Sequence, residues 1–213
     1  MYKKYIKRIL DFLLSLGAMV VLSPLFLVIT ILVRIKLGSP VFHRARRPGL
    51  NEKLFTLCKF RTMTNERDSK GELLPDTIRL TKFGRFLRNT SLDELPELWN
   101  ILIGDMSIIG PRPLAEQYLP YYNQEERKRH SVRPGLSGLA QISGRNSLNW
   151  EDKFAYDLKY IEELSFRTDV SILFKTIRKV LEKSDIGVRG VDSPIDFDVY
   201  RKNQLTENES VIR

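Results

Sequence analysis

The chain has 213 residues, which is enough for one ordinary domain with a hydrophobic core and too few for two comfortable ones. Its 42% apolar and 29% charged residues exclude an intrinsically disordered chain. The net charge of +9 favours a polyanionic partner: nucleic acid, an anionic membrane face or a phosphorylated substrate. One cysteine excludes a disulfide framework, and two histidines argue against a zinc site, so any metal would be a hard ion held by oxygen ligands.

An uncharged apolar segment runs from Phe12 to Val33. As one straight helix it would be about 33 Å long, enough to cross the hydrocarbon core of a bilayer. A signal peptide is disfavoured because the apolar run is too long and no small-residue cleavage site follows it. Two readings stay open: a helix that spans the membrane, and a kinked helix that enters and returns on the same side as a re-entrant hairpin.

A proline and the flanking charges favour the re-entrant hairpin. Pro24 removes a backbone hydrogen bond in the middle of the segment, and the hydroxyl of Ser23 can bond the carbonyl groups that this leaves free. Cations on both sides of the segment favour keeping both of its ends at the cytoplasmic face. These cations are Lys3, Lys4, Lys7 and Arg8 before the segment, and Arg34, Lys36, Arg44, Arg46 and Arg47 after it.

Two short apolar segments on either side of a Pro-Gly turn are predicted to form a β-hairpin. The segments are residues 41–47 and 53–62, and the turn is 48–51. In the second strand, the two-residue period places Lys59 and Arg61 on the same face as Phe55 and Leu57. We therefore expect two cations side by side at the end of an apolar strip.

Helical patterns dominate the rest of the chain. Polar residues 64–78 predict a surface loop, and residues 79–89, 150–164 and 168–183 predict helices. An apolar stripe on the last helix is typical of a core-facing surface, although an interfacial role at a membrane stays open. The stripe consists of Val170, Leu173, Phe174, Ile177 and Leu181.

The predicted fold class is therefore α+β and mainly helical, with one small β-hairpin. Residues 1–38 form the membrane-associated helix, residues 39–186 the single globular domain, and residues 187–213 a polar tail. Further strands cannot be placed from the pattern.

The segment 91–100 concentrates acidic residues at the expected start of a helix. Ser91 and Glu94 fit a capping box, and Pro96 is tolerated only near a helix start. Asp93 and Glu94 then lie in the first turn, at the positive end of the helix dipole. Ordinary capping explains such acidic residues, and the spacing alone favours capping over catalysis.

Cations around this segment favour a functional reading. Arg85 and Arg88 precede it, and Arg112, Arg133 and Arg145 each lie in a later segment rich in Gly and Pro. Backbone N–H groups of such loops can approach phosphate oxygens, which Arg can grip with two parallel hydrogen bonds. Each loop alone is a weak signal, because Arg beside Gly and Pro is usually part of a solvated turn.

Five motifs in this order resemble the bacterial sugar transferases, monotopic phosphoglycosyl transferases that start capsule, exopolysaccharide and glycoprotein glycan assembly. The motifs are KFRTM (59–63), SLDELP (91–96), NILIGDMSIIGPRP (100–113), RPGLSGLAQ (133–141) and GRN (144–146). The resemblance covers about residues 2 to 185 and is greatest to the small, single-domain members. It also matches Ser23 and Pro24 to the helix break of the family.

The resemblance implies a reaction and its residues. Asp93 would be the nucleophile, and Glu94 would assist it and hold a Mg²⁺ ion. A sugar-1-phosphate would pass from a UDP-sugar to undecaprenyl phosphate by a ping-pong route through an aspartyl-phosphosugar, releasing UMP. The candidate phosphate contacts are Lys59, Arg61, Arg88, Arg112 and Arg145.

The same resemblance implies a location and a donor. The enzyme would work at the cytoplasmic face of the bacterial inner membrane, with an N-acetylated amino or deoxyamino sugar as the expected donor sugar. Its partners would be the donor, the polyprenyl phosphate and the bilayer, with no nucleic acid; a homodimer stays open.

Two alternative functions remain. A membrane-anchored glycosyltransferase would release UDP and could use Asp196-Phe197-Asp198 as a D-x-D metal motif, although no Gly-rich nucleotide fingerprint accompanies it. Deleting the tail from residue 190 would then abolish activity, whereas phosphosugar transfer predicts that the deletion is tolerated. A basic, membrane-tethered binding module would be indifferent to Asp93→Asn, but no nucleic-acid-binding motif is present.

Overall fold

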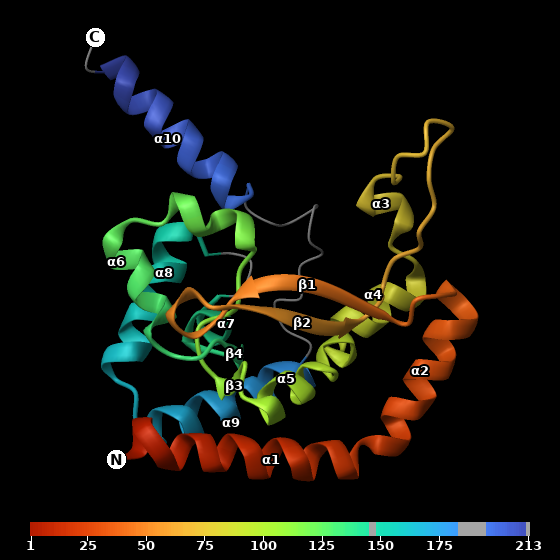
Figure 1. Cartoon of the computed structure of the whole chain (residues 1–213), viewed down its shortest axis with the longest axis horizontal. Coiled ribbons are helices and arrows are strands. Elements are labelled where there is room, and N and C mark those ends of the chain that lie inside the picture. Colours follow the sequence, from red (N-terminus) through yellow and green to blue (C-terminus); the bar gives the residue numbers. More distant parts are fainter. Residues whose placement is uncertain (145–147, 183–194, 212–213) are drawn as a thin grey trace.

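The computed structural model describes residues 1–144, 148–182 and 195–211. Helices predominate and surround two small sheets (Figure 1), so the predicted mainly helical α+β class is confirmed. The α-helices are α1 (Lys7–Val21), α2 (Ser23–Leu37), α3 (Asp76–Arg79), α4 (Lys82–Asn89), α5 (Glu97–Ile103), α6 (Gln124–Arg127), α7 (Leu139–Ser143), α8 (Trp150–Glu162), α9 (Phe166–Glu182) and α10 (Phe197–Val211). The strands are β1 (Phe42–Pro48), β2 (Leu54–Phe60), β3 (Ser107–Ile109) and β4 (Gly135–Ser137). Short π or 3-10 turns are η1 (Tyr2–Ile6), η2 (Leu50–Glu52), η3 (Leu92–Glu94), η4 (Glu116–Tyr121) and η5 (Lys128–Ser131).

The N-terminal apolar segment is broken where the sequence predicts. Helices α1 and α2 meet at Leu22, and Pro24 lies in the first turn of α2. The Ser23 hydroxyl donates to the carbonyl of Val20 at 2.8 Å, which satisfies an acceptor at the break. Among the described residues no single helix is long and apolar enough to cross a bilayer. The continuous η1–α1 helix and α2 pass this test of length and composition only as a pair, and the two are bent by 65° where they meet. The break is confirmed, and the re-entrant path through a membrane stays a prediction.

Polar contacts join α1 to the globular body. Asp11 is buried and accepts hydrogen bonds from the Ser107 hydroxyl at 2.7 Å and the Ile108 backbone N–H at 3.0 Å. The Arg8 guanidinium donates to the carbonyls of Ile101 and Leu102, at the C-terminal end of α5 where a cation is favoured. Helix α1 is therefore held in a fixed orientation against β3 and α5.

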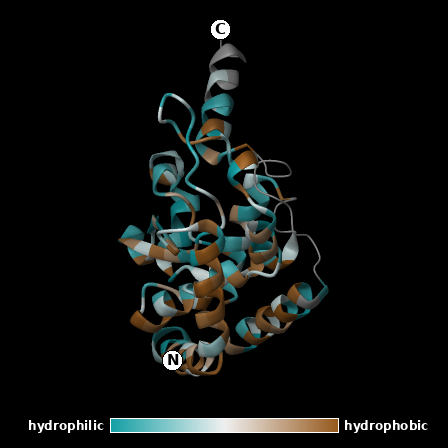
Figure 2. Cartoon of the chain, turned by 90° about the vertical axis from the view of Figure 1, so that its right-hand side faces the viewer, coloured by the Kyte–Doolittle hydropathy of each residue, from teal (hydrophilic) through white to brown (hydrophobic). Residues whose placement is uncertain are grey.

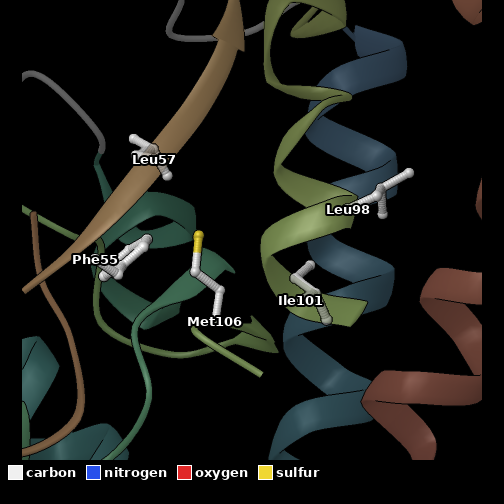
Figure 3. Close-up of a cluster of buried hydrophobic side chains, with 5 residues drawn as sticks. All are labelled: Phe55, Leu57, Leu98, Ile101 and Met106. Atoms are coloured by element: carbon white, nitrogen blue, oxygen red, sulfur yellow. The ribbon is translucent and has the colours of Figure 1, made fainter. Parts of the chain in front are cut away.

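Strands β1 and β2 form the predicted antiparallel hairpin, with His43 opposite Lys59. One face of β2 packs on α5, and Figure 3 shows the apolar contact between strand and helix. The cluster consists of Phe55, Leu57, Leu98, Ile101 and Met106. Because Lys59 follows Leu57 by two residues, the strand directs its amine along the same face, toward the start of α5.

A second sheet, which the sequence pattern did not place, brings together two predicted loops. Strands β3 and β4 are parallel, with Ser107 opposite Gly135 and Ile109 opposite Ser137. A side chain at Gly138 would collide with the chain, because its Cβ would lie 2.2 Å from the carbonyl oxygen of Gly110. This close approach fixes the backbone that leads into Arg112.

The two predicted helices near the C-terminal end are α8 and α9, but the apolar stripe on α9 is only partly core. Ile172 is buried beside Asp169, whereas Phe174 is 67% exposed and Ile177 is 49% exposed. Asp169 can be buried on this face because Tyr2 and Lys7 of the N-terminal segment bond its carboxylate at 2.6 and 2.7 Å. The core expectation is therefore wrong for Phe174 and Ile177.

The C-terminal segment packs on the body from residue 195 onward, and residues 187–194 lie outside the described part. Phe197 is fully buried among Tyr118, Tyr122, Trp150 and Phe154. The carboxylate of Asp196 accepts a hydrogen bond from the Tyr118 hydroxyl at 2.9 Å. Phe197 of the predicted polar tail therefore contributes to a core cluster. Deleting the tail from residue 190 would therefore disturb packing whichever reaction the protein catalyses. The deletion no longer separates phosphosugar transfer from a glycosyltransferase.

Candidate active site

The acidic segment forms a 3-10 turn followed by a helix. Ser91 has a left-handed φ of 54° and its side chain makes no capping hydrogen bond, so the predicted capping box is wrong. Pro96 instead occupies the N-cap position of α5, and Asp93 and Glu94 lie in η3, one turn earlier than expected. Glu97 occupies the first turn of α5 and adds a third acidic residue to the site.

The three acidic side chains, Asp93, Glu94 and Glu97, are here called the carboxylate cluster. The Lys59 amine lies 2.6 Å from Glu94 Oε1 and 2.9 Å from Glu97 Oε1. Arg112 Nη2 lies 2.8 Å from the same Glu94 oxygen. Asp93 and Glu97 are 8% and 2% exposed, whereas the Arg112 side chain is 44% exposed, so the cluster opens toward solvent beside Arg112.

The surrounding residues shift the pKa values of Asp93 and Glu94 in opposite directions. Burial and the charge of Glu94 raise the pKa of Asp93 to about 6, against the opposing effect of Lys59, Arg88 and Arg112. Burial alone would raise the pKa of Glu94, but Arg112 and Lys59 outweigh it and hold that pKa well below its usual range. Glu94 is therefore ionised, and Asp93 is mostly ionised at neutral pH.

The other predicted cations lie in different settings. Arg88 of α4 donates to the Thr62 hydroxyl at 3.0 Å, and its charge stabilises ionised Asp93. Arg61 is buried and donates to the carbonyls of Leu37 and Ser39 at the end of α2, so it secures α2 instead of facing the carboxylate cluster. Arg145 lies outside the described residues. The structure thus brings Lys59, Arg88 and Arg112 together around Asp93 and Glu94.

The donor set fits a Mg²⁺ ion. Asp93 and Glu94 offer adjacent carboxylates, which are the hard oxygen ligands that Mg²⁺ prefers. The part of the chain that the structure describes holds no group of three or more His, Cys, Asp or Glu side chains suited to a metal ion. Mg²⁺ is usually bound by one or two carboxylates with waters and substrate phosphates, so Glu94 together with substrate phosphates could hold it.

Sequence reasoning missed Glu97, Arg129 and Asp157. Arg129 and Asp157 form a buried ion pair at 2.8 Å, and Arg129 Nη2 donates to the backbone carbonyl of Arg112 at 2.7 Å. Glu97 could have been found from its spacing, since it follows Asp93 by four residues and would share its helix face. The Arg129–Asp157 pair joins residues 28 apart in the chain and has no local signal.

Glu97→Gln is expected to flatten the pH dependence of stability. Burial and the charge of Glu94 raise the pKa of Glu97 to about 7, above its unfolded value, so its contribution is fully present below about pH 4.5 and is lost as pH rises through 7. In chemical denaturation without Mg²⁺, the wild-type free energy of unfolding should fall by on the order of 1–3 kcal/mol more than that of Glu97→Gln between pH 5 and 8. The exposed Glu125→Gln is the control, and parallel curves for Glu97→Gln and wild type would refute this assignment.

Lys153 is a further cation on the Arg112 side of the site. Its amine lies 4.4 Å above the ring of Trp150, and burial together with the charge of Arg112 lowers its pKa. Within the described residues it has no ion pair. For the nucleotide-sugar donor that the resemblance implies, we expect Lys153→Met to raise KM about tenfold, as for loss of one phosphate contact, while kcat changes little. Lys159→Met, on the same helix, is the control, and an unchanged KM in Lys153→Met would contradict the contact.

Comparison with known proteins identifies the relatives of this chain. A family model described as bacterial sugar transferase matches residues 2–183. An uncharacterised sugar transferase of Bacillus subtilis, EpsL, is 51% identical over 85% of this chain and 90% of its own length. The exopolysaccharide production protein ExoY of Rhizobium meliloti is 40% identical over 82% of this chain and 84% of its own length. A UDP-glucose:undecaprenyl-phosphate glucose-1-phosphate transferase of Klebsiella pneumoniae is 41% identical over 81% of this chain, which matches 39% of that longer protein.

Proposed function

Because the chain belongs to the bacterial sugar transferase family, we propose that it transfers a sugar-1-phosphate from a UDP-sugar to undecaprenyl phosphate and releases UMP. The observation that carries the proposal is a buried, mostly ionised Asp93 beside Glu94, with Lys59, Arg88 and Arg112 around them. The name of the Klebsiella relative supports the same class of donor and acceptor. The product would be the first lipid-linked intermediate of a glycan.

The first half-reaction uses Asp93 as a nucleophile. A carboxylate oxygen of Asp93 attacks the β-phosphorus of the UDP-sugar, the bond from that phosphorus to the bridging oxygen breaks, and UMP leaves with the bond electrons. The raised pKa of about 6 leaves Asp93 ionised at pH 7 yet more basic than an ordinary aspartate. Arg112 and Lys59 offset the repulsion between the carboxylate and the diphosphate.

The second half-reaction returns Asp93 to its starting state. An oxygen of the lipid phosphate attacks the phosphorus of the aspartyl-phosphosugar, and the Asp93 carboxylate leaves. Glu94 would hold Mg²⁺ together with substrate phosphates, and the bound ion would neutralise negative charge on the transferring group. Glu94 is already held by Lys59 and Arg112, which fix its carboxylate before substrate arrives.

The apolar surface supports a site at the membrane face. Exposed large apolar side chains lie on α1, α2, α5 and α9, and Figure 2 shows apolar residues gathered at the end of the molecule that carries the N-terminus. With the re-entrant path, α1 and α2 would enter the cytoplasmic leaflet, and the carboxylate cluster would face the headgroups that carry the lipid phosphate. Both basic flanks would then remain on the cytoplasmic side.

Placing charge on α9 tests this membrane contact. The double substitution Phe174→Glu and Ile177→Glu should weaken binding to liposomes that contain anionic lipid and lower transfer to the lipid acceptor, because both side chains are exposed and apolar. Asn203→Glu on α10, which lies at the other end of the molecule in Figure 1, is the control. Unchanged liposome binding and transfer in the double variant would remove α9 from the interface.

The decisive experiment identifies the released nucleotide. Purified protein with Mg²⁺ and undecaprenyl phosphate is incubated with a panel of UDP-sugars that includes UDP-glucose, UDP-galactose and N-acetylated amino and deoxyamino sugars. UMP released with one donor, and not by Asp93→Asn, would support phosphosugar transfer and name the donor. Release of UDP would instead contradict the proposed reaction and favour a glycosyltransferase.

A further inference from the structure

The C-terminal segment lies outside the region that defines the family. The family model ends at residue 183, whereas residues 195–201 pack on the globular body. Phe197 has no exposed surface and contacts the rings of Tyr122 and Phe154, with centroid distances of 5.2 and 5.0 Å. A side chain buried to this degree fills space that the surrounding residues would otherwise have to close.

Phe197 is connected to Arg112 by direct contacts. The rings of Tyr122 and Phe154, which Phe197 packs against, both lie 5.8 Å from the guanidinium of Arg129. Arg129 in turn donates to the backbone carbonyl of Arg112 at 2.7 Å. Arg112 bonds Glu94 at 2.8 Å, so Phe197 and the carboxylate cluster are joined through two arginines.

A second set of contacts connects the segment to Lys153. The indole N–H of Trp150 donates to the carbonyl of Ile195 at 2.8 Å, and the Trp150 ring lies 5.2 Å from that of Phe197. The Lys153 amine lies over the same Trp150 ring, 4.4 Å from its centroid. The same few residues of the C-terminal segment thus support both cations, Arg112 and Lys153.

We propose that the carbonyl of Ile195 and the ring of Phe197 are a positioning element of the active site, which holds Arg112 and Lys153 in place for the phosphates of the donor. The inference rests on the proposed function, since it assigns those cations to the donor. Removing the Phe197 ring leaves a cavity under Tyr122, Phe154 and Trp150, and the aromatic rings that fix Arg129 and Lys153 can then shift. Small displacements of groups that bind reacting phosphates lower rates by large factors.

The test compares Phe197→Ala with Val199→Ala, a substitution at a half-exposed position of the same helix. UMP release is measured on the full chain at a temperature where each variant is folded. Phe197→Ala should lower kcat/KM for the donor by roughly tenfold or more, whereas Val199→Ala should leave it unchanged. Should Phe197→Ala not fold, Phe197→Leu keeps an apolar side chain without the ring and should show a smaller loss in the same direction.

A double-mutant cycle separates positioning from loss of folded protein. If Phe197 acts through Arg112 and Lys153, then Phe197→Ala should have less than about a twofold further effect on kcat/KM in a background that carries both Arg112→Ala and Lys153→Met. A merely structural role would reduce activity by the same factor in both backgrounds, which would overturn the inference. Wild-type kcat/KM in folded Phe197→Ala would overturn it equally.

The affinity for UDP distinguishes failure of the positioning role of Phe197 from failure of the proposed function. Calorimetry with UDP needs no turnover, and Phe197→Ala should weaken UDP binding while Val199→Ala does not. A wild-type protein that binds UDP but releases no UMP from any donor would contradict the proposed reaction alone. Equal UDP affinities for wild type and Phe197→Ala would contradict the positioning role alone.

Discussion

Asp93→Asn is expected to reduce UMP release by at least about a thousandfold, because a carboxamide cannot act as the nucleophile. The substitution keeps the size of the side chain, which is 8% exposed, so loss of activity should not come from a cavity. It also removes the charge of Asp93, and with it the repulsion between Asp93 and Glu94 that helps to raise the pKa of Asp93. Relief of that repulsion should leave the variant at least as stable as wild type at pH 8.

Mass spectrometry can show the covalent step directly. With donor and Mg²⁺ but no lipid acceptor, wild-type protein should release up to one UMP per chain and gain the mass of one sugar phosphate on the peptide containing Asp93. Asp93→Asn should gain none, and Asp105→Asn should behave as wild type because Asp105 lies outside the carboxylate cluster. An adduct on Glu94 or Glu97, or full activity in Asp93→Asn, would show that Asp93 is not the nucleophile.

The sequence predicted those parts of the site that follow from local geometry. A two-residue period was enough to place Lys59 on the face of β2 that carries Phe55 and Leu57, and the structure directs its amine to Glu94. Pro24 likewise marked the break between α1 and α2, since proline cannot complete the helical hydrogen bonds. The same periodicity misplaced Arg61, because β2 ends at Phe60 and the Arg61 side chain turns to the end of α2.

Other features depend on contacts between distant segments. The capping box failed because Ser91 adopts a left-handed conformation, which places Asp93 and Glu94 in a 3-10 turn before the helix. Phe197 looked like one apolar residue in a polar tail, and only its packing against Tyr118 and Trp150 makes it part of the core. Residues separated in this way carry no local pattern that reveals their contact.

Asp157→Ala is expected to be the most destabilising single substitution near the site. The side chains of Asp157 and Arg129 are 4% and 3% exposed, and both Nε and Nη2 of Arg129 donate to the Asp157 carboxylate. Removing the carboxylate leaves a buried guanidinium without its counter-charge, which costs about 3–5 kcal/mol. For a chain of this size the melting temperature should fall by roughly 10 °C. Thermal unfolding in detergent or nanodiscs measures the change.

Replacing both partners separates stability from catalysis. In Arg129→Met with Asp157→Leu, two apolar side chains occupy the site of the ion pair, so much of the lost stability should return. Activity should not return with it, because methionine cannot donate to the Arg112 carbonyl as Arg129 does at 2.7 Å. A double variant that recovers both stability and kcat would show that this hydrogen bond is dispensable for placing Arg112. Recovery of stability alone would show that Arg129 aligns Arg112. The role of Asp157 would then be to neutralise the charge of buried Arg129.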